Sequence, residues 1–256
     1  MAVITLTTDF GERDHYLAII KGAILCACPQ AQFITISNEI EPFNIVQAAF
    51  LFNQTWPNFP AGTIHLLSVN DYYAKEVRFL MIEHQGHYFI GPDNGLFSLI
   101  FDPCPEQALA LTNDLESTFP LKEIFAKTVG HIANKQPIDT LGKLVTNIQQ
   151  RLTWQPVIGP AHIRGSVIYI DHYDNAVTNI QRHLFEQVGQ NRAFKLFFKR
   201  HDPIKVLSKS YPDAQVGEPL CFFNSSGYLE IAINMGKAAS LLGLQIEDTV
   251  QIDFKK

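Results

Sequence analysis

The stretch TIHLLSVNDYYAKEVRFLMIEHQGHYFIGPDNGLFSLIF, from Thr63 to Phe101, decides the fold of the first half of this chain. It opens with the apolar run Ile64–Val69, which is typical of a strand buried on both faces of a sheet. The run ends at Asn70 and Asp71. A carboxylate is therefore expected where a central strand ends.

A second apolar run, Phe79–Ile82, begins directly after Arg78. The pair Gln85-Gly86 then predicts a two-residue hairpin turn, because glycine adopts positive φ without steric cost. Asp71 and Arg78 are expected to face each other across the loop between the two runs. Two interpretations stay open for them: a loop salt bridge, or a site at the end of a strand in an α/β sheet.

The residues before this stretch alternate between strand and helix patterns. Apolar runs at 3–7 and 33–36 predict strands, and the segments 15–26 and 45–56 have helical spacing. Such alternation predicts a mostly parallel sheet with flanking helices, whose ligands lie at the carboxyl ends of the strands. Asp9 follows the first strand, so it is expected near Asp71, where it suits the two hydroxyls of a ribose or simply caps the next helix.

After this stretch the chain continues with a strand at 108–112 and helices at 121–134 and 141–152. His131 lies on or beside the buried stripe of the first of these helices, as a core residue or a site residue. Gly130 beside it costs a helix interior about 1 kcal/mol relative to alanine, which indicates a close approach of another backbone.

The pattern changes near residue 158. Later apolar runs are short and separated by turn residues, which predicts an all-β C-terminal domain, either a small antiparallel barrel or a sandwich. The expected strands are 166–170, 193–198, 220–223, 228–233 and 249–253. The chain is therefore divided into an α/β domain, residues 1–158, and an all-β domain, residues 159–256.

Composition narrows the classes of function. Hydrophobic residues make up 46% of the 256 residues, charged residues make up 18%, and the net charge is −5. This composition predicts a globular protein without the basic surface that nucleic acid requires. The four cysteines lack zinc-site spacing and are expected to be reduced. No apolar run reaches the length of a membrane span, so we expect a soluble, cytoplasmic protein.

Two stretches of the second half are rich in residues that bind ligands. Asp171, Tyr173 and Asn175 follow one expected strand, and the turn that contains Ser225 precedes another. Amides offer a donor and an acceptor to a purine edge, and an aromatic ring can stack on a base. The same residue types are also common in ordinary turns.

Together these pieces resemble one family, the adenosine-forming S-adenosyl-L-methionine (SAM) hydrolases, or SAM hydroxide adenosyltransferases, whose halide-using relatives are fluorinases and chlorinases. The matching motifs occur in the family's order along nearly the whole chain. They are Thr7–Gly11 with Lys21-Gly22, Asp71 with Arg78, Gly91–Leu96, Ile124–Ala126 with His131, Asp171–Ile180 and Asn224–Glu230.

The resemblance implies a role for each site residue. Asp71, Arg78 and His131 match the family's water-activating set, and Asp9 resembles its ribose-binding carboxylate. In the second half Asp171 and Ser225 match the positions that hold the methionine group, while Tyr173 and Asn175 match adenine contacts. The resemblance also implies an N-terminal α/β domain, an all-β C-terminal antiparallel barrel as the domain 159–256, and a homotrimer with sites between subunits. It further implies that SAM is the substrate, with no metal and no cofactor.

The chain departs from the family pattern in four places. The loop 72–77 lacks the usual prolines and glycines, and Pro120–Glu123 replaces a usual His-Gly-Arg-Asp. Asp174 stands where glycine is usual, and Ser226 where the halogenases have arginine. These departures leave the expected water-activating set in place and put the shape of the pocket in question.

The expected chemistry needs few protein groups. The sulfonium of SAM departs from the ribose 5′ carbon as a neutral thioether, so the protein must supply an oriented, activated water. Arg78 would favour hydroxide, Asp71 would orient Arg78 and the water, and His131 would take or relay the proton. The alternatives are a SAM-dependent halogenase, a non-catalytic SAM or adenosine sensor, and a calcium-dependent nucleoside hydrolase, for which Asp9 and Asp14 supply few ligands.

Overall fold

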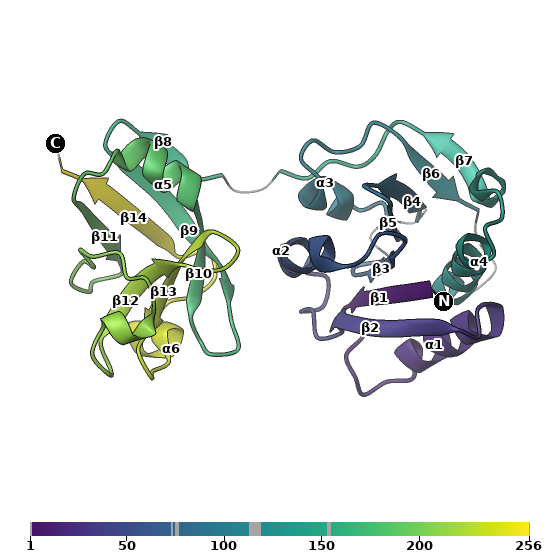
Figure 1. Ribbon diagram of the computed structural model, residues 1–256, viewed down its shortest axis with the longest axis horizontal. Coiled ribbons are helices and arrows are strands. Elements are labelled where there is room, and N and C mark those ends of the chain that lie inside the picture. The colour runs from purple at the N-terminus through teal and green to yellow at the C-terminus, as the bar shows by residue number, and fades with distance from the viewer. Residues whose placement is uncertain (1, 73, 75–76, 113–118, 153–154, 256) are drawn as a thin grey trace. The chain divides into compact units, whose positions relative to one another are not determined.

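The computed structural model describes the whole chain except residues 1, 73, 75–76, 113–118, 153–154 and 256. The chain forms two compact units, Met1–Thr153 and Trp154–Lys256 (Figure 1). The predicted boundary lies near residue 158, five residues further along the chain than the end of the first unit. Each unit has its own sheet and its own hydrophobic core.

The first unit is built on one seven-stranded sheet with the order β2-β1-β3-β5-β4-β6-β7. Its strands are β1 (Ala2–Thr8), β2 (Ala31–Ser37), β3 (Ile64–Ser68), β4 (Phe79–His84), β5 (His87–Pro92), β6 (Ala108–Leu111) and β7 (Gly142–Val145). Its helices are α1 (Tyr16–Ala27), α2 (Ile45–Thr55), α3 (Leu96–Ile100) and α4 (Pro120–Ala133), with the 3₁₀ turns η1 (Trp56–Asn58) and η2 (Ile138–Leu141).

The sheet is mixed, which corrects the prediction of a mostly parallel one. Strands β2, β1, β3 and β5 run parallel, whereas β4, β6 and β7 add to β5 in antiparallel pairs. The reversal follows from the predicted hairpin, which is confirmed: His84 pairs with His87, and Gln85 and Gly86 both have positive φ. A two-residue turn of this kind can only join antiparallel strands.

The helices cover both faces of this sheet. Apolar residues of α1 and α4 share one core with β1 and β3, and residues of α2 and α3 share another on the opposite face. The predicted cap of α2 is confirmed, because Asn44 Oδ1 accepts a hydrogen bond from Gln47 N at 2.9 Å. The predicted close approach at Gly130 is also present: a Cβ there would lie 3.2 Å from the Cβ of Ala27 on α1.

The predicted helix at 141–152 is wrong. Leu141 ends η2, and the residues from Gly142 to Val145 form the edge strand β7, paired with β6. Gly142 packs against the backbone oxygen of Ala110 so closely that a Cβ would overlap it. Pairing with the backbone N–H and C=O groups of β6 stabilises the strand conformation here more than the helical spacing of the apolar residues stabilises a helix.

Two buried histidines lie within this first unit. His65 Nδ1 lies 2.7 Å from Thr5 Oγ1, and His65 Nε2 lies 3.2 Å from His87 Nδ1. The ring of His65 stacks on Phe89. Burial lowers the pKa of His65 to about 3, with a further contribution from the neighbouring His87. These rings are therefore neutral and structural at neutral pH.

The second unit is an antiparallel sheet with the order β11-β14-β9-β10-β13-β12, and β8 pairs with β9. Its strands are β8 (Val157–Gly159), β9 (His162–Ile170), β10 (Ala176–Gln181), β11 (Phe194–Phe198), β12 (Pro219–Phe223), β13 (Tyr228–Ile233) and β14 (Thr249–Phe254). Two helices, α5 (Arg182–Gly189) and α6 (Ala238–Leu242), and the turn η3 (Tyr211–Asp213) complete it.

The antiparallel sheet was predicted, but the unit is less regular than an all-β barrel. The first half of β9 pairs with β14 and the second half with β10, so one long strand carries the sheet around the core. Among the described residues the end strands β11 and β12 do not pair with each other, so the sheet forms a curled half-barrel that is not closed. None of the helices in the described part of the chain has the length and apolar character needed to cross a membrane.

Candidate active site

Two carboxylates lie together at the carboxyl edge of the first sheet. Asp9 follows β1 and Asp71 follows β3, and these strands are parallel neighbours. Asp9 Oδ2 accepts hydrogen bonds from the backbone N–H of Phe43 (3.0 Å) and of Asn70 (3.1 Å). Asp9 therefore connects two loops at this edge. It does not cap the next helix, because the N-cap residue of α1 is His15.

Asp71 has a buried, poorly compensated carboxylate. Its side chain is 5% exposed, Ser68 Oγ donates to its Oδ2 at 2.6 Å, and its Oδ1 makes no hydrogen bond with the described residues. Burial raises the pKa of Asp71 to about 7, the hydrogen bond from Ser68 opposes the rise, and the charge of Asp9 adds to it. A carboxyl with a pKa near neutrality is suited to take a proton from a reacting group.

The turn after β5 holds this edge in place. Asn94 is 1% exposed, and its Nδ2 donates to the carbonyl oxygens of Val69 (2.9 Å) and Asn70 (3.1 Å), directly before Asp71. Gly91 lies against β3, where a Cβ would come within 2.8 Å of the Leu67 oxygen. The motif Gly91–Leu96 therefore positions the strand end that carries Asp71.

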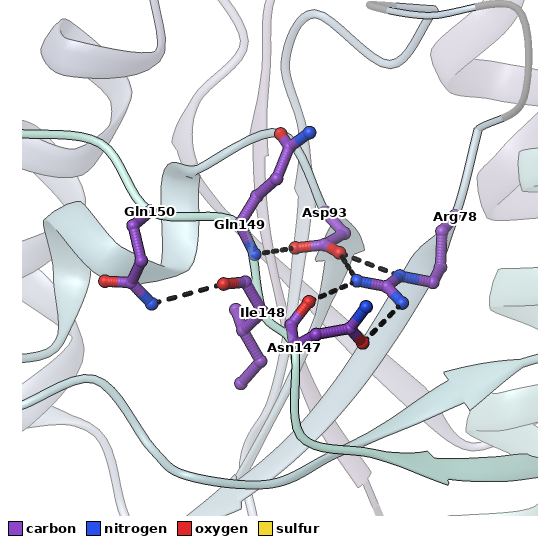
Figure 2. Close-up of polar contacts among 6 residues, drawn as sticks. All are labelled: Arg78, Asp93, Asn147, Ile148, Gln149 and Gln150. Carbon is purple, nitrogen blue, oxygen red and sulfur yellow. Dashed lines mark hydrogen bonds and ion pairs between the residues drawn. The ribbon is translucent and has the colours of Figure 1, made fainter.

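Arg78 binds Asp93 and not Asp71 (Figure 2). Its Nε donates to Asp93 Oδ2 at 2.8 Å, its Nη2 donates to the same oxygen, and Nη1 and Nη2 bind the Oδ1 (3.0 Å) and backbone oxygen (2.6 Å) of Asn147. Asp93 Oδ1 accepts from Gln149 N at 2.9 Å. The expected ion pair between Arg78 and Asp71 is absent from the described residues, and Arg78 instead ties β4 to the segment after β7.

His131 lies at the opposite edge of the sheet from Asp71. Helix α1 ends at Ala27, just before β2 begins beside the start of β1, and Gly130 packs on Ala27. The seven residues of β1 therefore separate His131 from the carboxyl edge by roughly 20 Å. His131 Nδ1 lies 3.1 Å from the Lys127 oxygen of its own helix. Within one chain the predicted set of Asp71, Arg78 and His131 is not assembled.

The start of α4, rather than its end, reaches the carboxyl edge. Phe119 packs against Phe10 (6.3 Å between ring centroids) and Tyr16 (5.5 Å). Pro120 is the first residue of the helix and is buried. The segment that departs from the usual His-Gly-Arg-Asp thus lies next to the residue that follows Asp9.

In the second unit Asp171 and Asn175 form one tight pair. Asn175 is 2% exposed; its N–H donates to Asp171 Oδ1 at 2.8 Å, and its Nδ2 donates to Asp171 Oδ2 at 3.0 Å. Asn175 Nδ2 also donates to Tyr211 Oη at 3.1 Å. Tyr173 is 75% exposed, and Ser225 is exposed in the turn before β13. Tyr173 and Ser225 are therefore accessible to solvent within their own unit.

The structure accommodates Asp174, at the position where the family usually has glycine, in two ways. Its φ is 70°, a left-handed conformation in which glycine is usual and aspartate is tolerated. Its Oδ2 accepts from Ser240 N at 2.7 Å, which satisfies a backbone donor in the first turn of α6. The aspartate therefore keeps the glycine-like turn and adds a contact to α6.

Three further residues of these edges were not predicted. Phe43 is 71% exposed at φ 70° and is tied to Asp9, while Tyr211 and Glu230 join the contacts of Asn175. The only sequence signal for Phe43 is its position as an aromatic residue directly before the helix cap Asn44. Glu230 alternates with Leu229 and Ile231, a pattern that indicates the strand face away from the core, so the sequence did not signal its burial. Nothing in the sequence signalled Tyr211.

The described residues contain no group of three or more His, Cys, Asp or Glu side chains placed to hold a metal ion. Asp14, which was considered with Asp9 as a calcium ligand, is exposed before α1. Of the loop 72–77, residues 73, 75 and 76 lie outside the described residues. The donors that the described residues offer at the carboxyl edge are therefore two carboxylates with backbone and amide groups around them.

Comparison with known families assigns both halves of the chain. Residues 4–142 match the SAM hydroxide adenosyltransferase N-terminal domain, and residues 165–251 match the SAM hydroxide adenosyltransferase C-terminal domain. A crystal structure of an uncharacterized conserved protein from Thermotoga maritima has a TM-score of 0.86 and 26% identity, covering 98% of this chain and 99% of that one.

Curated relatives match over almost the full length. The (R)-S-adenosyl-L-methionine hydrolase of Methanocaldococcus jannaschii is 27% identical over 98% of this chain and 96% of its own. The protein of the same name from Thermus thermophilus is 27% identical over 96% and 97%, respectively. A fluorinase of Actinopolyspora mzabensis is 25% identical over 93% of this chain and 92% of its own.

Proposed function

Because the chain belongs to the SAM hydroxide adenosyltransferase family, we propose that it hydrolyses S-adenosyl-L-methionine to adenosine and L-methionine. The observation that carries the proposal is the match to (R)-S-adenosyl-L-methionine hydrolases over nearly all of this chain and of theirs. The enzyme is accordingly an S-adenosyl-L-methionine hydrolase. The pair of Asp9 and Asp71 at the carboxyl edge supports the assignment, since ligands of such sheets bind there.

The reaction is a displacement at the ribose 5′ carbon. Water attacks in line with the departing sulfur, so that a carbon–oxygen bond forms as the carbon–sulfur bond breaks. Both electrons of the broken bond stay with sulfur, and methionine leaves as a neutral thioether. One proton of the attacking water must pass to a base. The protein therefore needs to orient a water and accept its proton.

Asp71 is the residue proposed to accept that proton. Its pKa near 7 and its Oδ1, which makes no hydrogen bond with described residues, support this role. Ser68 fixes the other oxygen, which leaves Oδ1 to bind the water. Asp9 is proposed to bind the ribose hydroxyls with its own Oδ1, because Oδ2 already accepts two backbone hydrogen bonds.

Arg78 is proposed to act through the turn that follows β5. Its contact with Asp93 anchors the residue directly before Asn94, and Asn94 holds the backbone before Asp71. Direct stabilisation of hydroxide, the role implied by the family resemblance, would require the guanidinium to exchange its contact with Asp93. A relay through His131 of the same chain would have to span roughly 20 Å along β1, so the proposed mechanism contains no such step.

The second unit is proposed to supply the remaining contacts with the substrate. Asp171 and Ser225 would hold the methionine group, and Tyr173 and Asn175 the adenine. The exposure of Tyr173 and Ser225 in their own unit supports sites built between the subunits of a homotrimer. The proposed enzyme is cytoplasmic. It needs neither metal nor cofactor for the reaction, because a sulfonium leaving group develops no negative charge as it departs.

Incubation of the purified protein with SAM, EDTA and ¹⁸O-labelled water tests the proposal. Mass spectrometry should find methionine and adenosine, with the label on the adenosine 5′ oxygen. Adenine with a ribosyl product would indicate cleavage of the N-glycosidic bond and reject the proposal. The fluorinase relatives favour one second candidate, a halogenase; in a parallel reaction with chloride, 5′-chloro-5′-deoxyadenosine would identify that activity.

A further inference from the structure

A continuous chain of hydrogen bonds joins the two ligand-type turns of the second unit. It begins at Asp171 and Asn175, passes through Tyr211, and reaches Glu230, whose Oε1 accepts from Tyr211 Oη at 3.3 Å. Glu230 Oε2 accepts from Asn224 Nδ2 at 3.2 Å. Asn224 Oδ1 in turn accepts from the backbone N–H groups of residues 226 and 228, which closes the turn around Ser225.

The donors and acceptors in this hydrogen-bond network fit only one assignment of hydrogens. Asp171 offers an acceptor, so the Asn175 atom that faces it is Nδ2, and Nδ2 spends its second hydrogen on Tyr211 Oη. Tyr211 must then donate its single hydrogen to Glu230. Both oxygens of Glu230 are thereby acceptors, which fits a carboxylate. The orientation of the Asn175 amide is therefore fixed, with its Oδ1 directed away from both partners.

Tyr211 is itself held by contacts outside the chain of polar groups. Its ring packs edge-on against Phe222 of β12, with 5.0 Å between centroids. The turn η3 that carries it is fixed by Asp213, whose Oδ2 accepts from the backbone N–H groups of Lys209 (2.6 Å) and Ser210 (3.2 Å). The phenol oxygen is therefore placed by the fold and not by a ligand.

Burial and charge mark this network as more than turn chemistry. Glu230 is 5% exposed and has no cationic partner among the described residues. Burial raises the pKa of Glu230, the hydrogen bond from Asn224 opposes the rise, and the charge of Asp171 adds to it. Burial and the charge of Glu230 raise the pKa of Tyr211 to about 12, so the phenol stays protonated. A buried carboxylate of this kind is costly to keep unless a network satisfies it.

We propose that Tyr211 is a positioning residue for SAM binding: its phenol joins Asn175 to Glu230 and so fixes the Asn175 amide relative to the Ser225 turn. Tyr211 touches neither the reacting carbon nor the water. It acts on the affinity for the adenine and methionine ends of the substrate through Asn175 and Asn224. The inference rests on the proposed function and adds to it a residue that the family motifs do not contain.

Steady-state kinetics of Tyr211→Phe with SAM test the inference. The lost hydrogen bond should raise KM about 3- to 10-fold, because a neutral hydrogen bond of this kind has a modest net contribution. The kcat should stay within about twofold, since the chemistry occurs at Asp71. The melting temperature should shift by a few degrees at most, as the residue is 39% exposed and its ring is retained.

Tyr88→Phe is the matched control. Tyr88 lies at the start of β5 in the first unit, where its ring packs against the core and takes no part in the network, so the KM of this variant should equal that of the parent. A double-mutant cycle with Glu230→Gln tests the coupling. Adding Tyr211→Phe to Glu230→Gln should raise KM by a smaller factor than adding Tyr211→Phe to the parent, because both changes break the same path of hydrogen bonds.

The outcomes separate this inference from the function on which it rests. A parent protein without turnover of SAM rejects the proposed function and the inference together. With an active parent, an unchanged KM in Tyr211→Phe, or fully multiplicative effects in the double variant, overturns the inference alone. A lower kcat at unchanged KM overturns it as well, since it would place Tyr211 in the chemical step.

Discussion

The guanidinium of Arg78 binds the carboxylate of Asp93, fifteen residues further along the chain, through two of its nitrogens. Asp93 is 2% exposed, whereas the Arg78 side chain is 30% exposed. The pair therefore neutralises a buried carboxylate from the solvent side. It also connects β4 to the turn that holds the end of β3, so loss of the contact should affect both the stability of the unit and the position of Asp71.

Arg78→Ala should lower the free energy of unfolding by about 2 kcal/mol, because it leaves the buried Asp93 without its cation. Thermal denaturation measures the change. Arg13→Ala, an exposed arginine of the same unit, should stay within about 0.5 kcal/mol of the parent. Adding Asp93→Asn to Arg78→Ala should restore part of the loss. An Arg78→Ala protein as stable as the parent, but inactive, would instead assign Arg78 to the reaction directly.

Asp71→Asn should separate activity from stability. The pKa of Asp71 is raised to about 7 in the folded protein, so the folded state favours the protonated carboxyl. The stability that this protonated carboxyl contributes is fully present below about pH 4, the range of the unfolded chain's pKa, and is lost as the pH rises to 7. The asparagine variant should therefore gain stability relative to the parent between pH 4 and pH 8, while kcat falls at least about a hundredfold. Urea titrations at both pH values measure the first effect. A constant difference would contradict the raised pKa.

The rate of the parent should follow the same ionisation. If Asp71 accepts the proton of water, kcat/KM should rise with pH through about 7 and then level off. A profile that is flat from pH 5 to pH 8, in a buffer series of constant ionic strength, would exclude Asp71 as the base.

His65→Gln should reduce the acid sensitivity of the first unit. The pKa of His65 is lowered to about 3, so the stability that the neutral ring contributes is present above about pH 6.5 and is lost as the pH falls toward 3. Unfolding in that range takes up one proton at this site, a slope of about 1.4 kcal/mol per pH unit. Glutamine keeps polar atoms for Thr5 and His87 and cannot titrate. Equal slopes for variant and parent would contradict the assignment.

Mixed variants should reveal whether subunits share sites. Asp71→Ala lacks the proposed base and Asn175→Ala lacks a proposed adenine contact, so each protein should be inactive by itself. If the protein is the proposed homotrimer, mixed assemblies formed by subunit exchange would contain some sites with both residues intact, and part of the activity should return. If exchange is demonstrated by mass and no activity returns, each site lies within one chain.

Apart from β7, which was expected to be part of a helix, the strands of the first unit could be predicted because their signals are local. The apolar run from Ile64 to Val69 defines β3, and the carboxylates at its end and at the end of β1 follow from parallel pairing. The hairpin at Gln85-Gly86 required only its turn residues. The mixed direction of the sheet could not be predicted in the same way, since β6 and β7 join β4 through pairings that no local pattern encodes.

The differences between the expected site and the geometry within one chain have one physical origin. The spacing of His131 from Ile124 predicts which face of α4 it occupies, but not which end of that helix reaches the carboxyl edge. Packing of Gly130 on Ala27 decides that, and it is a contact between distant segments. The partner of Arg78 was missed for the same reason: Asp93 and Asp71 are both carboxylates near β4, and only the path of the turn selects between them.

The β4–β5 hairpin has a consequence for how the first unit folds. Its pairs, from His84 with His87 outward to Phe79 with Pro92, are close in sequence and cost little loop-closure entropy. The parallel pairs of β1 with β2 and β3 join segments about 30 and 60 residues apart. We expect the hairpin to form first and to present β5 as a template for β3, so that the strand end carrying Asp71 is ordered late in folding.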